Sequence, residues 1–371
     1  MSEQVDRLRL VRTEGVGPVA YRRLMARFDS AAAALAALPR LALAGGRAEP
    51  PRIPTRDAAR REIDSVAALG GRLLFLGQPG YPELLARLDD APPVLAVLGD
   101  PALLSARAVA VVGSRNASAN GQRLAETLGA DLAAAGLVVV SGLARGIDSA
   151  AHRGALRTGA TIACIAGGLD IAYPSENRAL QDRIAEAGAV VAEYPPGTAP
   201  QARHFPRRNR VIAGLSLGVV VVEAAPRSGS LITARLAVEA GREVFAVPGS
   251  PLDPRARGGN GLIRDGAHLT ETAHDVLDAL PQDGSRLRAR LELSEDPSTP
   301  PHGEWAPGEH ASVRDAVLDL LGPAPTAVDD LIRRCQFSGP AVLSVLLDLE
   351  VAGRIETLPG NRVALLGGAG A

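Results

Sequence analysis

The chain has 371 residues, of which 46% are apolar and 22% charged, and its 40 basic residues against 41 acidic ones give a formal charge of −1. This length and composition are typical of a folded protein with two or three domains. All 40 basic residues are arginine. The absence of lysine excludes the nucleotide-binding loop that ends in Gly-Lys-Ser/Thr, and it excludes a lysine that acts as a Schiff base or as a general base.

The sequence predicts a protein without a metal or a cofactor. Cys164 and Cys335 lie far apart, and the six histidines have no zinc-ligand spacing with cysteine or with each other. Buried thiols in a reducing compartment are expected. No apolar run reaches the roughly 18 residues that span a membrane, and the first residues do not resemble a signal segment. We therefore expect a cytoplasmic protein with no membrane partner.

The first 66 residues predict a small helical domain. Apolar positions at helical spacing run from 5 to 28 around Gly15 and Gly17. This break fits either a helix-hairpin-helix, whose turn amides can face a phosphate, or a glycine-capped corner in a small bundle. Residues 39–56 are rich in proline, glycine and arginine, which indicates a loop or a domain boundary.

A second domain is predicted at 67–280, where short apolar runs alternate with helical patterns. The expected parallel strands are 109–112, 137–140, 161–165, 190–192, 219–222 and 244–247. The expected helices are 121–135, 147–158, 176–187, 207–215 and 230–240. Near-continuous β-branched strands between helices predict an α/β fold with a doubly wound parallel sheet.

Residues 281–310 carry five prolines among many charges and predict a linker. Three short helical patterns at 312–321, 326–335 and 340–352, followed by two short strands, predict a winged helix at 311–366. From 311 onward, acidic residues outnumber arginines, and the third helix has no Arg, Asn or Gln that could read bases. We therefore expect this domain to contact protein, or a second subunit, rather than DNA.

Small and polar residues follow the predicted parallel strands. They form the segments 113–115, 141–148, 167–170 and 228–230. In a doubly wound sheet these segments converge at one edge and offer amide donors to anions. The dinucleotide fingerprint G-x-G-x-x-G is absent after the first of these strands, which disfavours nicotinamide and flavin. Arg145 and Asp148 fit either a local ion pair or cap, or a role in binding.

Residues 203–210 read Arg-His-Phe-Pro-Arg-Arg-Asn-Arg and form the most distinctive segment. Their guanidinium groups suit phosphate oxygens, and Phe205 offers a face on which a base can stack. A solvated basic turn ahead of a helix is the alternative. Together with the strand ends, this segment offers arginine, a stackable ring and amide donors without an obvious nucleophile, base or metal, so binding is favoured over catalysis.

Five long motifs carry a family resemblance. They are 113–115, 141–152, 174–177, 205–216 and 222–234, and two further segments of the pattern follow at 245–249 and 259–263. Together they resemble the hallmark of the DNA-processing protein A family (DprA, also called Smf), closely over roughly 70–280. The resemblance implies an extended Rossmann-like domain between a helical domain and a winged helix. It also implies a homodimer that binds single-stranded DNA, protects incoming strands and loads the RecA recombinase during natural transformation.

The strand-end pattern and the resemblance together predict the nucleic-acid site, in which an arginine such as Arg203 replaces a lysine that the family often has. The predicted residues are Gly113, Ser114, Arg115, Gly142, Arg203, Phe205, Arg207, Arg208, Asn209, Arg210, Ser228, Gly229 and Ser230. No catalytic residue is predicted. The resemblance places the dimer contact near Leu269, Val276, Leu277 and Leu280.

The alternative to binding is an enzyme that processes nucleotides in the same pocket. Related Rossmann-like folds include nucleotide phosphoribohydrolases, which carry Pro-Gly-Gly-x-Gly-Thr and a glutamate at the pocket. That motif is missing here, and Gly167, Gly168 and Glu223 are its nearest remnants. We expect Glu223 to cap or orient Asn209 or a neighbouring loop rather than to act in hydrolysis.

Overall fold

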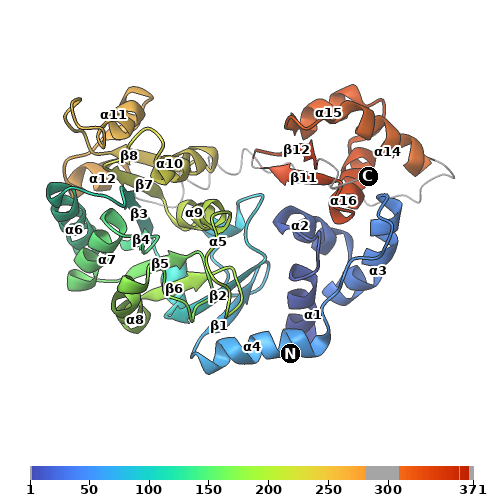
Figure 1. Ribbon diagram of the computed structural model, residues 1–371, viewed down its shortest axis with the longest axis horizontal. Coiled ribbons are helices and arrows are strands. Elements are labelled where there is room, and N and C mark those ends of the chain that lie inside the picture. The colour runs from blue at the N-terminus through green and yellow to red at the C-terminus, as the bar shows by residue number, and fades with distance from the viewer. Residues whose placement is uncertain (1, 281–308, 359, 367–371) are drawn as a thin grey trace. The chain divides into compact units, whose positions relative to one another are not determined.

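The structure is a computed structural model that describes residues 2–280, 309–358 and 360–366 (Figure 1). It divides into two compact units. One unit joins the N-terminal segment, up to Arg61, with the C-terminal segment, and the other begins at Glu62 and contains the large sheet. Nearly all of the predicted linker at 281–310 lies outside the described residues, and its last two positions begin a helix.

Within the described residues, the second unit is built on one nine-stranded sheet. Its order is β1-β2-β6-β5-β4-β3-β7-β8-β9. The strands from β3 to β9 pair in parallel, while β2 pairs antiparallel with both β1 and β6. The strands are β1 (Arg72–Phe75), β2 (Val94–Gly99), β3 (Ala108–Gly113), β4 (Val138–Ser141), β5 (Thr161–Ile165), β6 (Ala189–Ala192), β7 (Gly218–Val222), β8 (Glu243–Ala246) and β9 (His268–Leu269). The strand order reverses between β3 and β7, so the predicted doubly wound α/β fold is confirmed.

Helices cover both faces of this sheet (Figure 1). The helical elements from residue 56 to residue 280 are α4 (Arg56–Ala68), α5 (Glu83–Ala86), η1 (Pro101–Ser105), α6 (Ala119–Ala134), α7 (Ile147–Thr158), η2 (Ser175–Asn177), α8 (Arg178–Ala187), α9 (His204–Leu215), α10 (Gly229–Glu239), α11 (Arg257–Arg264) and α12 (Ala273–Ala279). Of these, α4 crosses the boundary between the two units. The predicted helix at 207–215 begins three residues earlier, so the arginine segment is helical. The predicted helix at 176–187 begins with the 3-10 turn η2.

Successive side chains of the central strands pack on opposite faces of the sheet. Val109 and Val111 of β3 pack with α6, α7 and α12, whereas Ala108 and Ala110 pack with α9 and α10. Because both faces of the sheet are covered, its parallel strands are apolar throughout rather than alternating.

Two of the predicted dimer residues belong to this core. Val276 is fully buried and Leu280 is 2% exposed, and both pack in the same cluster as α6 and α7. Leu277 is partly buried against that cluster. Val276 and Leu280 are therefore not available to a second subunit, which corrects the prediction for these two. Leu269, on the edge strand β9, is 52% exposed, and a contact through it stays a prediction.

The other unit contains the predicted helical and winged-helix domains. The N-terminal helices are α1 (Ser2–Val11), α2 (Pro18–Arg27) and α3 (Ala31–Ala44). The winged helix comprises α14 (Glu309–Leu320), β10 (Thr326–Ala327), α15 (Val328–Arg334), α16 (Gly339–Val351), β11 (Ile355–Leu358) and β12 (Arg362–Leu365). Its strands pair in the order β10-β12-β11. Both predicted domain types are confirmed.

Within this unit the third winged-helix helix, α16, contacts the N-terminal helices. Arg27 donates to the hydroxyl of Ser344 at 3.3 Å and lies 3.9 Å from the carboxylate of Asp348. A Cβ at Gly15, where φ is +82°, would lie 2.6 Å from the carbonyl oxygen of Val351. Glycine therefore permits a close backbone approach here, and α16 is occupied by protein from the same chain.

Candidate nucleic-acid interface

An open pocket of about 600 Å³ lies at the carboxyl ends of β3, β4 and β5, beside the first turns of α9. Its walls are three loops and one helix terminus. The lining residues are Arg115, Asn116, Gly142, Ala144, Arg145, Ala172, Tyr173, Pro174, Ser175, Glu176, Phe205 and Arg208. This is the edge at which a doubly wound sheet binds its ligands, and the position agrees with the predicted strand-end site.

Two aromatic rings and two guanidinium groups meet in the pocket. The ring of Phe205 lies 5.7 Å from that of Tyr173, at an interplanar angle of 58°. The guanidinium carbon of Arg115 lies 5.0 Å from the centre of the Phe205 ring, and that of Arg208 lies 5.9 Å from it. Tyr173 is half exposed. The pocket therefore combines flat apolar faces with cations, a combination suited to bases and phosphates.

Arg208 is held inside the pocket wall by the turn after β4. Its Nη1 lies 3.9 Å from the carboxylate of Asp148, and that carboxylate accepts hydrogen bonds from the amides of Gly142 and Ala144. Burial lowers the pKa of Arg208 and raises that of Asp148, and their mutual attraction opposes both shifts. Asp148 thus holds the buried guanidinium of Arg208 and, at the same time, the turn after β4.

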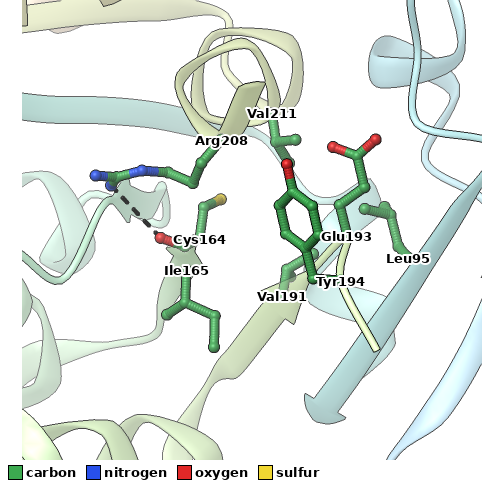
Figure 2. Close-up of a pocket in the computed structure, with 8 residues that line it drawn as sticks. All are labelled: Leu95, Cys164, Ile165, Val191, Glu193, Tyr194, Arg208 and Val211. Carbon is green, nitrogen blue, oxygen red and sulfur yellow. Dashed lines mark hydrogen bonds between the residues drawn. The ribbon is translucent and has the colours of Figure 1, made fainter. Parts of the chain in front are cut away.

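Behind Arg208 the structure closes against the sheet. Its Nη1 donates to the carbonyl oxygen of Cys164 at 3.5 Å, and Figure 2 shows the guanidinium turned to the opposite side from Glu193 and Tyr194. The cavity in this layer is only about 10 Å³, enough for one water molecule. Burial raises the pKa of the Cys164 thiol to about 12, so it stays protonated. Within the described part of the chain, a ligand can therefore reach Arg208 from the open pocket and not through this cavity.

Arg145 and Glu176 form an exposed ion pair across the pocket mouth. Nη2 of Arg145 donates to Oε2 of Glu176 at 2.9 Å. The guanidinium of Arg145 lowers the pKa of Glu176, chiefly through this hydrogen bond. The structure shows the local contacts that were one alternative for these residues: Arg145 forms an ion pair, and the carboxylate of Asp148 caps a turn. Both groups also lie at the pocket or directly behind it.

Several predicted site residues lie outside the pocket lining. Arg210 is buried, and its Nη2 donates to Oε1 of Glu193 at 2.6 Å. Asn209 is also buried and donates to the carbonyl oxygen of Gly229 at 3.3 Å. Arg203 and Arg207 are exposed at the start of α9. The arginine segment therefore divides: Phe205 and Arg208 line the pocket, whereas Arg210 holds α9 to the end of β6.

The strand-reversal point between β3 and β7 is occupied by a carboxylate of the chain. Glu223, whose φ is +53°, accepts hydrogen bonds from the amide and the hydroxyl of Ser118, the N-cap of α6. A Cβ at Gly121 would lie 2.5 Å from the Glu223 carboxyl carbon. Glu223 thus orients a neighbouring loop, one of its two expected roles. Among the described residues, no hydrogen bond joins it to Asn209, which donates to Gly229 instead.

The remaining predicted residues support backbone turns. A Cβ at Gly113 would lie 1.9 Å from the carbonyl oxygen of Val222, so glycine permits β3 and β7 to approach there. The hydroxyl of Ser114 accepts from the amide of Asn116 at 3.2 Å. Ser228 is the N-cap of α10, and its hydroxyl accepts a hydrogen bond from the amide of Ser230. Gly229, in the first turn of α10, is exposed. None of these residues lines the pocket.

Sequence reasoning missed Tyr173 as a pocket residue. It directly precedes the 174–177 motif and forms a cis peptide bond with Pro174. An aromatic residue next to a strand-end motif was the signal that could have found it. Within the described ranges, no group of His, Cys, Asp and Glu could hold a metal ion, and no helix is long and apolar enough to cross a membrane.

Three protein-family models match the three domains of the chain. Residues 72–281 match the model of DNA recombination-mediator protein A, residues 1–65 match a DprA-like N-terminal helix-hairpin-helix domain, and residues 297–361 match a DprA winged-helix domain.

Individual relatives and solved structures agree. DNA processing protein DprA of Bacillus subtilis is 44% identical over 62% of this chain and 77% of its own length, and protein Smf of Escherichia coli is 40% identical over 77% and 75%. The X-ray structure of DprA from Streptococcus pneumoniae is similar with a TM-score of 0.59 and 44% identity, covering 62% of this chain and 80% of that one.

A structure of DNA processing protein A from Helicobacter pylori, which gives insights into the single-stranded DNA binding mode of that protein, matches with a TM-score of 0.51 and 30% identity. It covers 58% of this chain and 96% of the other. The domain order, the sheet, the strand-end motifs and these matches lead to one conclusion: the chain belongs to the DNA recombination-mediator protein A (DprA) family.

Proposed function

We propose that this chain binds single-stranded DNA in the pocket, with a base on the Phe205 and Tyr173 rings and phosphates on Arg115 and Arg208. The observation that carries the proposal is the placement of Phe205 within 6 Å of two guanidinium groups in an open pocket. Stacking accepts every base because each has a flat face, and arginine forks suit phosphate oxygens. The Helicobacter pylori relative, which binds single strands, supports the same ligand.

Single strands fit this pocket better than duplex DNA. In a duplex the bases are stacked on one another, so a stacking platform inside a pocket can be reached only by an unpaired base. The chain's formal charge of −1 gives it no overall attraction to polyanions, so affinity has to arise from the few arginines gathered at the site. Binding should therefore depend both on unpaired bases and on salt.

The test is fluorescence anisotropy with labelled single-stranded and duplex DNA of one sequence across a range of salt concentrations. We expect a clear preference for the single strand and a logarithmic salt slope of about 0.7 for each phosphate contacted. Equal affinity for both forms, or no binding to either, would contradict the proposal.

In the cell, this binding would protect incoming strands and load the RecA recombinase onto them during natural transformation and homologous recombination. We place the protein in the cytoplasm as a homodimer, with the exposed edge strand β9 and Leu269 at the subunit contact. Sedimentation of wild type and Leu269→Glu tests the dimer: the variant should be monomeric. RecA assembly on a strand coated with single-strand-binding protein tests loading, which should accelerate only when this protein is present.

The proposed role is binding without catalysis. Glu223, the nearest remnant of a hydrolase carboxylate, is hydrogen-bonded to the N-cap of α6 and does not line the pocket. Incubation with nucleoside monophosphates should therefore release no free base. Release that disappears in Glu223→Gln would instead favour the phosphoribohydrolase alternative.

A further inference from the structure

A second basic site lies away from the pocket, in the groove between α6 and α7. The groove has a volume of about 500 Å³ and contains three arginines, Arg123 from α6 and Arg153 and Arg157 from α7. Its remaining lining residues are Ala119, Gln122, Glu126 and Thr127. None of these residues belongs to a sequence motif, because they are spread over two helices.

The groove carries an excess of positive charge. Nη1 of Arg157 donates to Oε1 of Glu126 at 2.8 Å, which neutralises the one acidic residue in the lining. Within the described part of the chain, no ion pair or hydrogen bond is found for the side chains of Arg123 and Arg153, and both are exposed. Two uncompensated guanidinium groups therefore face one groove, in a chain whose formal charge is only −1.

Close helix packing shapes the groove. A Cβ at Gly129 would lie 2.4 Å from the carbonyl oxygen of Ala151, and one at Gly154 would lie 1.9 Å from that of Glu126. Figure 1 shows α6 and α7 side by side against the sheet. Because glycines bring the two backbones together, the long arginine side chains line an open surface groove rather than filling the space between the helices.

Both helices that form the groove begin within a few residues of the proposed DNA pocket. Helix α6 begins at Ala119, four residues after Arg115, and Ala119 lines the groove. Helix α7 begins at Ile147, whose amide donates to the carbonyl oxygen of Ser114 at 3.2 Å. Both helices therefore start at the pocket edge and run away from it, and from Ala119 to Glu126 the groove follows α6 for about 10 Å.

We propose that this groove binds the phosphate backbone of the single strand beyond the pocket; the proposal rests on the proposed single-stranded DNA binding. The groove has no aromatic residue in its lining, so it supplies charge without stacking and accepts any sequence. The pocket holds bases and the first phosphates, and Arg123 and Arg153 hold the phosphates that follow. The affinity of the protein should accordingly increase with strand length.

The experiment compares two homopolymeric strands, one of about six nucleotides that fills the pocket and one of about 16 that also reaches the groove. The variant is Arg123→Ala with Arg153→Ala. The matched control is Arg183→Ala with Arg264→Ala, which removes two exposed arginines from α8 and α11. We expect the groove variant to bind the long strand about tenfold more weakly at 0.1 M salt, with a salt slope smaller by about 1.4, because two phosphate contacts are lost. Its affinity for the short strand should equal that of the control.

Arg123→Lys with Arg153→Lys should retain most of the long-strand affinity, because lysine also binds phosphate as a point charge. If the wild type binds both strands and the alanine variant matches the control on the long one, the groove proposal is overturned while the pocket stands. If the wild type binds neither strand, the proposed function and the groove both fail. An equal loss on both strands would show an effect on the pocket and would also contradict the groove.

Discussion

The guanidinium of Arg208 occupies the space that a side chain at position 142 would need. A Cβ built on Gly142 would lie 1.2 Å from Nη1 of Arg208 and 2.4 Å from its Cζ. Both residues line the pocket, and the amide of Gly142 and Nη1 of Arg208 approach the same carboxylate, that of Asp148. The glycine in the strand-end motif therefore makes room for a buried cation, and one turn fixes the position of that cation in the pocket wall.

Gly142→Ala should weaken DNA binding nearly as much as Arg208→Ala, because the new methyl group displaces the guanidinium. Each variant should lose about 1.5 to 3 kcal/mol of binding free energy, the range for a hydrogen bond to a charged group. The double variant should lose little more than either single one, since both changes remove the same contact. Anisotropy titrations of all four proteins measure this coupling. Additive losses would show that the two residues act separately.

Phe205→Ala should lose about 1 to 3 kcal/mol of binding free energy while leaving the salt slope unchanged, because stacking releases no counterions. Tyr173→Ala should have an effect of the same kind. Arg115→Ala is the matched contrast, since it removes a charge next to the same ring and should reduce the slope by about 0.7. Titrations at several salt concentrations separate the two classes. A reduced slope in Phe205→Ala would argue against stacking.

The sequence predicted the fold and the edge of the sheet at which the pocket lies, because layer packing requires apolar strands and the close turns after them require glycine. It did not separate Arg208 from Arg210. Successive residues of a helix point about 100° apart, and the sequence pattern did not fix where the helix begins. The contact of Glu223 could not be predicted either. Its partner Ser118 is 105 residues away, and no local sequence pattern indicates such a contact.

Arg210 should contribute to stability rather than to DNA binding. Its guanidinium is buried and paired with Glu193, and Arg210→Ala would leave that carboxylate without this cation. We expect the free energy of unfolding to fall by about 3 to 5 kcal/mol, the cost of breaking a buried ion pair. The salt slope of DNA binding should stay at the wild-type value at a temperature where the variant is folded. Urea denaturation and anisotropy together test this, and Arg210→Ala with Glu193→Ala should recover part of the lost stability.

His152 should make the second unit less stable in mild acid. Its ring is fully buried, with Nδ1 2.7 Å from the hydroxyl of Thr161, and burial lowers its pKa to about 3. In the unfolded chain the pKa is about 6.5. Between these values the unfolded state binds a proton that the folded state does not, so stability falls as the pH drops below about 6.5. The loss should reach about 2 kcal/mol at pH 5.

Urea denaturation of the wild type and of His152→Asn at pH 7 and pH 5 measures this contribution. Asparagine can keep a hydrogen bond to Thr161 and does not titrate, so the variant should lose less stability between the two pH values than the wild type. The comparison is made within each protein, so a lower overall stability of the variant does not affect it. DNA binding at pH 7 should be unchanged, since His152 does not line the pocket. An identical pH dependence in both proteins would mean that another buried group accounts for the acid sensitivity.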